Sequence, residues 1–299
     1  MTQTETIDSD LHNLDMLDTS EVLQHLLSSQ QLAVKALHKA KPAIDNAVAL
    51  SHQRLVEGRG RLIYAGAGAS GRLGVQDGAE LWPTFGWPHE RLMLCIAGGD
   101  AALVSSQDGV EDNLDAAVTE AKDAKLTSDD VVIALAASGK SPWTCAWLDQ
   151  AKQSGALTIG IANNAGTPLL EIAQCPVWLD TGAEVLAGST RMSAGTAQKI
   201  ALNLFSTALM IRMNRTYGNL MVDMAAVNKK LDIRRVRLLQ GVLPHLSDDK
   251  AQQALSDAEG WVKLAALLAL GDSSDDAHRR LAEYQGSLRS AIDSLQSES

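Results

Sequence analysis

Two runs of glycine and serine in the middle of the chain have the composition of anion-binding loops. Gly66-Ala-Gly-Ala-Ser-Gly-Arg72 follows the apolar residues Leu62–Ala65, and Ala137-Ser-Gly-Lys-Ser141 follows the apolar run Val131–Ala136. A glycine loop between a strand and a helix N-terminus presents backbone N–H groups to an anion, and serine hydroxyls suit a phosphate monoester. Alone, each could be a tight turn or a simple helix cap; together they predict a phosphate site.

A third segment, Gly182–Ser193, precedes a long helical pattern and adds polar side chains. Ser189 is placed either to cap the following helix or to face a sugar. Glu184 is either a polar residue of the site or a solvated loop charge, and the sequence leaves both open. We include Glu184 and Ser189 among the candidate substrate-binding residues.

Two carboxylates lie in contexts that suit proton transfer. Glu80 is followed by Trp82 and Phe85, and desolvation by such neighbours would keep a carboxyl group protonated, as an acid requires. Glu111 precedes a predicted helix, whose N-terminus would keep it ionised as a base. By themselves these positions are only suggestive, because most glutamates are surface charges and Glu111 could be a helix cap.

The sequence does not indicate a nucleotide site. The spacing Gly66-x-Gly68-x-x-Gly71 fits the dinucleotide-binding pattern formally. However, no acidic residue is convincingly placed to hold a ribose, because the second apolar run passes through Ala97-Gly-Gly before Asp100. The pattern Gly-x-x-x-x-Gly-Lys-Ser/Thr does not occur.

The elements that must position these residues alternate between short apolar runs and helical patterns. Nearly continuous apolar runs are typical of strands covered on both faces of a parallel sheet. The predicted strands are Leu62–Ala65, Leu92–Ile96, Val131–Ala136, Leu157–Ile161 and Val177–Leu179. The predicted helices between and after them include Asn113–Ala124, Thr144–Ser154 and Ser193–Met213. We therefore predict an α/β domain with a doubly wound parallel sheet, in which ligands bind at the carboxyl ends of strands.

Helices are predicted before and after this sheet. Apolar spacing over residues 20–57 predicts two helices, broken or kinked near Pro42, after a short helix around Leu11–Leu17. Gly271-Asp-Ser-Ser-Asp275 is a loop and helix-cap signal within a small C-terminal helical bundle. The bundle segments are Asn228–Val242, Asp249–Leu255, Ala258–Leu270 and Asp275–Leu295. The predicted domains are 1–50 (helical), 51–223 (α/β) and 224–299 (helical bundle).

Charge and composition narrow the class of partner and compartment. A net charge of -10 over 299 residues argues against nucleic acid as the main partner. No apolar run is long enough to span a membrane, and the acidic start of the sequence does not resemble a signal peptide. Cys95, Cys145 and Cys175 are widely spaced, which favours core thiols in a reducing cytoplasm over a metal site. We expect a cytoplasmic protein.

With these residues assembled, the chain resembles the N-acetylmuramic acid 6-phosphate etherases of the sugar isomerase (SIS) domain superfamily. The resemblance covers nearly everything from Arg61 to about Arg237, and the motifs in this order are highly specific. They are Gly66-Ala-Gly-Ala-Ser-Gly-Arg-Leu-Gly-Val75, Pro83-Thr-Phe-Gly86, Ala136-Ala-Ser-Gly-Lys-Ser-Pro142, Glu184-Val-Leu-Ala-Gly-Ser-Thr-Arg191, Ser193-Ala-Gly-Thr-Ala-Gln-Lys199 and Tyr217-Gly-Asn-Leu-Met-Val-Asp223.

The resemblance implies a SIS-like fold and a lyase that uses neither metal nor cofactor. Such an enzyme removes D-lactate from C3 of N-acetylmuramic acid 6-phosphate. The two family glutamates match Glu80, the acid toward the lactyl oxygen, and Glu111, the base at C2. The implied phosphate contacts are Ser70, Ser138 and Ser141, with the N–H groups of Gly71 and Gly139. A homodimer is also implied.

The chain departs from the family pattern around Glu80. It reads Asp77-Gly-Ala-Glu-Leu-Trp-Pro83 where the family usually reads Asp-Ala-Ser-Glu-Cys-Pro-Pro, and Gln76 and Trp87 are also unusual. These changes bear on substrate preference more than on the type of reaction.

Three other functions remain open. A non-catalytic sugar-phosphate sensor would share the domain, but the presence of Glu80 and Glu111 in their motifs favours an enzyme. In an aldose–ketose isomerase, Glu184 rather than Glu80 would matter. A DNA-binding regulator is the least favoured, because no basic helix-turn-helix segment precedes the α/β part.

Overall fold

The computed structural model of the protein describes residues 2–224 and 229–298. The chain forms two compact units. The first contains Met1–Ala79 and His89–Ser206, and the second contains Glu80–Pro88 and Thr207–Ser299. The domain boundaries expected after residues 50 and 223 stay predictions. Residues 225–228, which include the first residue of the predicted helical segment Asn228–Val242, lie outside the described residues.

The first unit is built on one parallel sheet of five strands in the order β2-β1-β3-β4-β5. Leu62 on β1 pairs with Leu92 on β2 and with Val131 on β3. This arrangement confirms the predicted fold class. The strands are β1 (Leu62–Gly66), β2 (Leu92–Ile96), β3 (Val131–Leu135), β4 (Leu157–Ala162) and β5 (Cys175–Trp178), within two residues of their predicted bounds.

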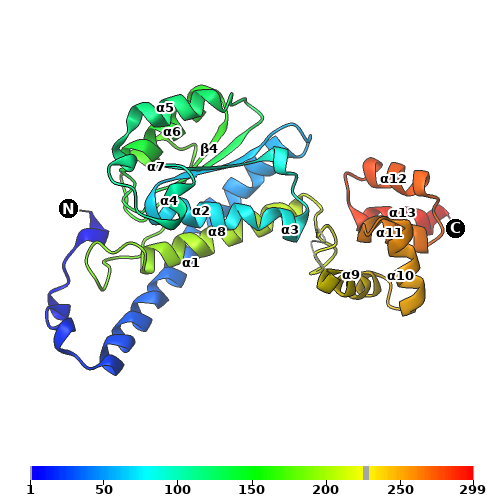
Figure 1. Cartoon of the computed structure of the whole chain (residues 1–299), viewed down its shortest axis with the longest axis horizontal. Coiled ribbons are helices and arrows are strands. Elements are labelled where there is room, and N and C mark those ends of the chain that lie inside the picture. Colours follow the sequence, from blue (N-terminus) through cyan, green and yellow to red (C-terminus); the bar gives the residue numbers. More distant parts are fainter. Residues whose placement is uncertain (1, 225–228, 299) are drawn as a thin grey trace. The chain divides into compact units, whose positions relative to one another are not determined.

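Helices cover both faces of this sheet, as Figure 1 shows: α1, α2 and α8 lie on one face, and α5, α6 and α7 on the other. Their bounds are α1 (Thr19–Leu55), α2 (Gly68–Ala79), α4 (Ala101–Val104), α5 (Leu114–Asp123), α6 (Pro142–Gln153), α7 (Pro168–Ile172) and α8 (Ser193–Arg212). On the α6 face, Ile63 and Val132 pack with the buried indoles of Trp143 and Trp147. Both faces of the inner strands are therefore apolar, as the continuous runs predicted.

The predicted break near Pro42 is wrong. α1 is one helix of 37 residues with Pro42 inside it. Its start is fixed by a capping box between Asp18 and Glu21. Proline removes one backbone hydrogen bond from a helix interior. However, buried side chains continue at helical spacing on both sides of it, including Leu37, Ile44 and Val48. Packing of this face outweighs the local cost of the proline.

The residues before α1 form three short 3-10 turns, Gln3–Glu5, Ser9–Leu11 and Leu14–Met16, where one short helix was predicted around Leu11–Leu17. Among the described residues, no helix is long and apolar enough to cross a membrane.

The second unit is helical and contains α3 (Leu81–Phe85), α9 (Lys229–Val242), α10 (Asp248–Asp257), α11 (Val262–Ala269), α12 (Ser274–Glu283) and α13 (Leu288–Glu298). The segment expected as Asp275–Leu295 is thus two helices, α12 and α13. Ser273 caps α12 by accepting a hydrogen bond from the N–H of Asp276, as the cap signal predicted.

A buried ion pair fixes part of this unit. Lys263 Nζ lies 2.6 Å from Asp223 Oδ2 and donates to the carbonyl of Asn214 at 2.8 Å. Burial lowers the pKa of the Lys263 ammonium and raises the pKa of the Asp223 carboxyl, although the pairing opposes both shifts. The guanidinium of Arg215 also approaches Asp223 and stacks over the Trp87 ring.

Candidate active site

The two predicted serine loops lie side by side at the carboxyl edge of the sheet. They follow β1 and β3, which are paired neighbours. The strand order reverses between these two strands, since β2 lies outside β1 whereas β4 and β5 lie beyond β3. In open α/β sheets this reversal is where ligands bind. The geometry therefore places both loops at the expected ligand site of the fold.

Ser70 and Gly71 belong to a helix rather than to a long loop. β1 ends at Gly66, and α2 begins at Gly68, so both residues lie in the first turn of α2 and are buried. A Cβ atom on Gly71 would lie 2.7 Å from the carbonyl oxygen of Gly66, which shows how closely this turn approaches the strand. The Gly71 N–H donates to the carbonyl of Ala67 at 3.0 Å, so this group is already engaged.

The second loop presents two half-buried serines before α6. The Ser138 hydroxyl accepts from the N–H of Lys140 at 3.2 Å, and the Ser141 hydroxyl accepts from Thr144 Oγ1 at 3.1 Å. Within the described residues Ser141 makes no hydrogen bond that caps α6, although it stands at the cap position. The simple-cap alternative is therefore wrong for Ser141. The Gly139 N–H donates to the carbonyl of Ala136 and, like that of Gly71, is already engaged.

The chain after β4 holds this second loop in place. Asn164 Nδ2 donates to the carbonyl of Ala137 at 2.9 Å, and the Leu169 N–H donates to the carbonyl of Gly139 at 3.1 Å. Gly139 has a φ of +67° and touches Thr167 so closely that a side chain would not fit. These supporting residues were not predicted, although two asparagines directly after an apolar strand were a usable signal.

Glu184 is neither a solvated loop charge nor free in the site. Its side chain is buried, and its two carboxylate oxygens accept the N–H groups of Ser193 at 2.9 Å and Ala194 at 2.8 Å. A carboxylate at this position satisfies the first N–H groups of α8 and complements the helix dipole. Ser189 is half-buried on the same segment, and its N–H donates to the carbonyl of Leu186. Glu184 therefore fixes the loop that carries Ser189.

The two candidate catalytic glutamates are exposed, each in its own unit. The desolvation of Glu80 expected from Trp82 and Phe85 does not occur in this structure, because α3 leaves the carboxyl group in solvent. Glu111 lies in a single 3-10 turn, and Asn113 caps α5 in its place. The exposed position leaves both carboxylates accessible to a ligand.

A buried carboxyl group that the sequence analysis did not single out lies behind the first loop. Asp77 on α2 accepts hydrogen bonds from Tyr64 Oη at 2.8 Å, Asn203 Nδ2 at 2.7 Å and Ser206 Oγ at 3.2 Å. Burial raises the pKa of the Asp77 carboxyl above its ordinary value of 3.8, although these hydrogen bonds oppose the shift. Asp77 thus joins α2, β1 and α8.

In the described part of the chain, no group of three or more His, Cys, Asp or Glu side chains could hold a metal ion. All three cysteines are free thiols. Burial raises the pKa of Cys95 to about 12 and that of Cys145 to about 11.

Sequence comparisons agree with this fold. A family model described as "SIS domain" matches residues 110–208, and one described as "Glucokinase regulatory protein N-terminal SIS domain" matches residues 43–152. The class is thus that of proteins with a SIS domain.

Relatives of nearly full length narrow the class to one family. The chain is 45% identical to the N-acetylmuramic acid 6-phosphate etherase of Deinococcus radiodurans, over 97% of this chain and 95% of the relative. It is 41% identical to the enzyme of the same name from Nostoc punctiforme, over 98% of this chain and 95% of the relative. The chain belongs to the N-acetylmuramic acid 6-phosphate etherase family.

A solved phosphoheptose isomerase from Francisella tularensis aligns with 64% of the chain and 97% of its own, with 18% identity and a TM-score of 0.48.

Proposed function

We propose that the protein is an N-acetylmuramic acid 6-phosphate etherase, a carbon–oxygen lyase of amino sugar recycling. It converts N-acetylmuramic acid 6-phosphate and water into N-acetylglucosamine 6-phosphate and D-lactate. Family membership over nearly the whole chain supports this reaction. The observation on the structure that carries the proposal is the pair of serine-bearing helix starts after β1 and β3, at the point where strand order reverses.

The reaction proceeds by elimination followed by hydration. In the open-chain sugar the C2 hydrogen is acidic because it lies next to the aldehyde. The C2–H and C3–O bonds break, a C2=C3 double bond forms, and D-lactate leaves with a proton on its ether oxygen. Water then adds its oxygen to C3 and a proton to C2, which gives N-acetylglucosamine 6-phosphate.

Each step needs a group that this chain supplies. We assign Glu111 as the base that removes the C2 proton and Glu80 as the acid that protonates the departing oxygen, as in the family. Ser70, Ser138 and Ser141 are the proposed phosphate contacts. Gly71 and Gly139 contribute by close packing rather than through their N–H groups, which are engaged within the chain. Ser189 is proposed to contact the sugar from the segment that Glu184 holds.

The assembly and compartment are proposed as well. Three exposed apolar residues, Leu23, Leu27 and Val34, form a stripe at helical spacing on α1. A second copy of the chain is the proposed cover, which makes the enzyme a homodimer. The free thiols support a cytoplasmic location.

D-lactate release from N-acetylmuramic acid 6-phosphate tests the reaction. Glu80→Gln and Glu111→Gln should each lower kcat by about two to four orders of magnitude, the usual contribution of general acid–base catalysis. The roles separate in D2O: Glu111→Gln should lose deuterium exchange at C2, whereas Glu80→Gln should keep it. Glu90→Gln, an exposed glutamate outside the proposed machinery, is the matched control and should keep full activity.

The double variant should bind N-acetylglucosamine 6-phosphate and release no lactate. Lactate release by the double variant would refute the catalytic assignment. Binding without lactate release by the wild-type protein would instead indicate a sugar-phosphate sensor, and a ketose product would indicate an isomerase.

A further inference from the structure

Thr4 is completely buried, although nearly all its neighbours in residues 2–10 are exposed. It lies in the single 3-10 turn Gln3–Glu5. Such a short turn has no apolar face with which to bury a residue, so the contacts that hold Thr4 must come from elsewhere in the first unit.

Three hydrogen bonds hold Thr4. Its N–H donates to Asn164 Oδ1 at 3.2 Å, and Asn164 Nδ2 donates to Thr4 Oγ1 at 3.0 Å. The N–H of Gly188 donates to the carbonyl of Thr4 at 3.0 Å. Figure 1 shows the corresponding arrangement, in which the first residues (blue) lie beside the segment that leads into α8.

Each partner of Thr4 connects it to a segment that carries proposed substrate contacts. Asn164 Nδ2 also donates to the carbonyl of Ala137, which directly precedes Ser138. Gly188 directly precedes Ser189. One buried threonine thus connects two loops at the carboxyl edge of the sheet, and the amide of Asn164 uses its oxygen and its nitrogen to do so.

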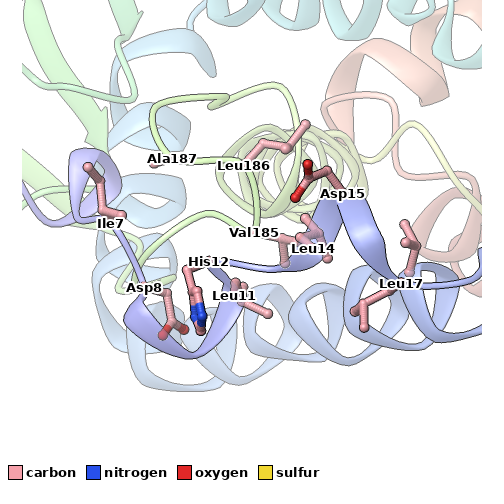
Figure 2. Close-up of a pocket in the computed structure, with 11 residues that line it drawn as sticks. Ile7, Asp8, Leu11, His12, Leu14, Asp15, Leu17, Val185, Leu186 and Ala187 are labelled. Carbon is pink, nitrogen blue, oxygen red and sulfur yellow. The ribbon is translucent and has the colours of Figure 1, made fainter.

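The chain that follows Thr4 continues along the second of these loops. Ile7, Leu11 and Leu14 face Val185 and Leu186 around a cavity of about 520 Å³ (Figure 2). The contact at Thr4 is therefore not isolated, because the residues that follow it also lie along the segment 184–189.

We propose that the turn Gln3–Glu5 is a built-in part of the sugar-phosphate site and that Thr4 is a positioning residue. It holds the serine loop 137–141 through Asn164 and the segment 184–189 through Gly188. This inference rests on the proposed function. Its physical basis is that binding groups must be held within about 0.5 Å of their productive geometry by neighbours that are themselves fixed.

Thr4→Val tests the role of the hydroxyl, because valine has the same shape but cannot accept the hydrogen bond from Asn164. The N–H of Asn164 Nδ2 that bonds to Thr4 Oγ1 then lacks a partner. Asn164 is held less firmly, and the serine loop 137–141 loses part of its support. We expect KM for N-acetylmuramic acid 6-phosphate to rise about tenfold, the size of effect that loss of one buried hydrogen bond produces. kcat should change less than about twofold, because the phosphate does not react.

Two matched variants define the specificity of this effect. Thr4→Ser keeps the oxygen and should restore KM to near the wild-type value. Thr6→Val makes the same substitution two residues away on an exposed side chain and should leave KM unchanged. Combining Thr4→Val with Asn164→Ala should raise KM no further than Asn164→Ala alone, because both act through one bond.

Hydrogen–deuterium exchange supplies a readout that does not depend on activity. Peptides covering 137–147 should exchange faster in Thr4→Val, while peptides covering α11 in the second unit should not change. If the wild-type protein released no lactate, the proposed function would fail, yet exchange would still test Thr4. Unchanged exchange in 137–147, an unchanged KM, or faster exchange and a loss of fold throughout the molecule would each overturn the positioning role.

Discussion

At Gly71 there is no room for even one side-chain carbon atom. Its backbone is in contact with the carbonyl of Gly66, so the first turn of α2 lies directly against the end of β1. This closeness brings Ser70 to the carboxyl edge of the sheet. Glycine is required here because it has no side chain; its N–H is already bonded to the carbonyl of Ala67.

We predict that Gly71→Ala moves the first turn of α2 away from β1. The added methyl group would overlap backbone atoms that cannot rotate away, and such overpacking costs about 1–3 kcal/mol. Urea unfolding should show this loss, and calorimetry should show weaker binding of N-acetylglucosamine 6-phosphate.

Gly74→Ala is the control, because its methyl group would meet the end of the Leu135 side chain at 3.3 Å, which can adjust. Equal binding by Gly71→Ala and the wild-type protein would contradict a role for this turn in the site.

At the scale of elements, Asp77 connects α2 to β1 and α8. Tyr64 on β1 and both Asn203 and Ser206 on α8 donate to its carboxyl group. Because burial raises the pKa of Asp77 above 3.8, the folded protein holds this proton to higher pH than the unfolded chain. The stability that this group contributes is therefore complete below the unfolded value and is lost as pH rises through the raised folded pKa.

Asp77→Asn should remove this pH dependence, since asparagine stays neutral and can still bond to the same partners. The free energy of unfolding of the variant, minus that of the wild-type protein, should increase as pH is raised from about 4. Urea titrations over a series of pH values measure this difference. A difference that is constant or that shrinks with rising pH would contradict the assignment.

The sheet could be predicted from the sequence because its strands are short apolar runs with clear ends. Val131–Leu135 is buried at every position, and such a run has few alternatives in an α/β chain. The predicted break near Pro42 was wrong because the prediction followed local propensity, whereas the buried stripe of α1 continues through this residue. Propensity is a weak guide wherever tertiary packing decides.

The site was predictable only where chemistry and local sequence coincide. Ser138 and Ser141 follow a strand, so their edge of the sheet could be inferred. Glu184 could not be assigned, because its bonds to Ser193 and Ala194 depend on a loop that brings residues about ten positions apart together. Thr4 was out of reach for the same reason, since Asn164 lies 160 positions away in the sequence.

At the scale of the whole molecule, the exposed stripe on α1 predicts self-association. Leu23, Leu27 and Val34 have exposed fractions of 53%, 65% and 49%, and apolar residues in such an arrangement mark contact surfaces. Sedimentation equilibrium should give a mass about twice the 31.8 kDa of one chain.

Leu23→Asp combined with Leu27→Asp should give a monomer, because a dimer interface would then bury uncompensated charges. Val104→Asp is the control, since Val104 is 91% exposed on a different element, and it should leave the mass unchanged. A monomeric wild-type protein, or a double variant with the wild-type mass, would contradict this surface as the interface.

The placement of the three thiols has a practical consequence for such experiments. Cys95, Cys145 and Cys175 all belong to the first unit, and none belongs to the second. Cys95 and Cys175 are buried, and the raised pKa of each of the three thiols keeps it protonated and slow to react at neutral pH. The rate at which a thiol-reactive dye labels the protein therefore measures opening of the first unit alone. The helical unit contains no cysteine and is not labelled.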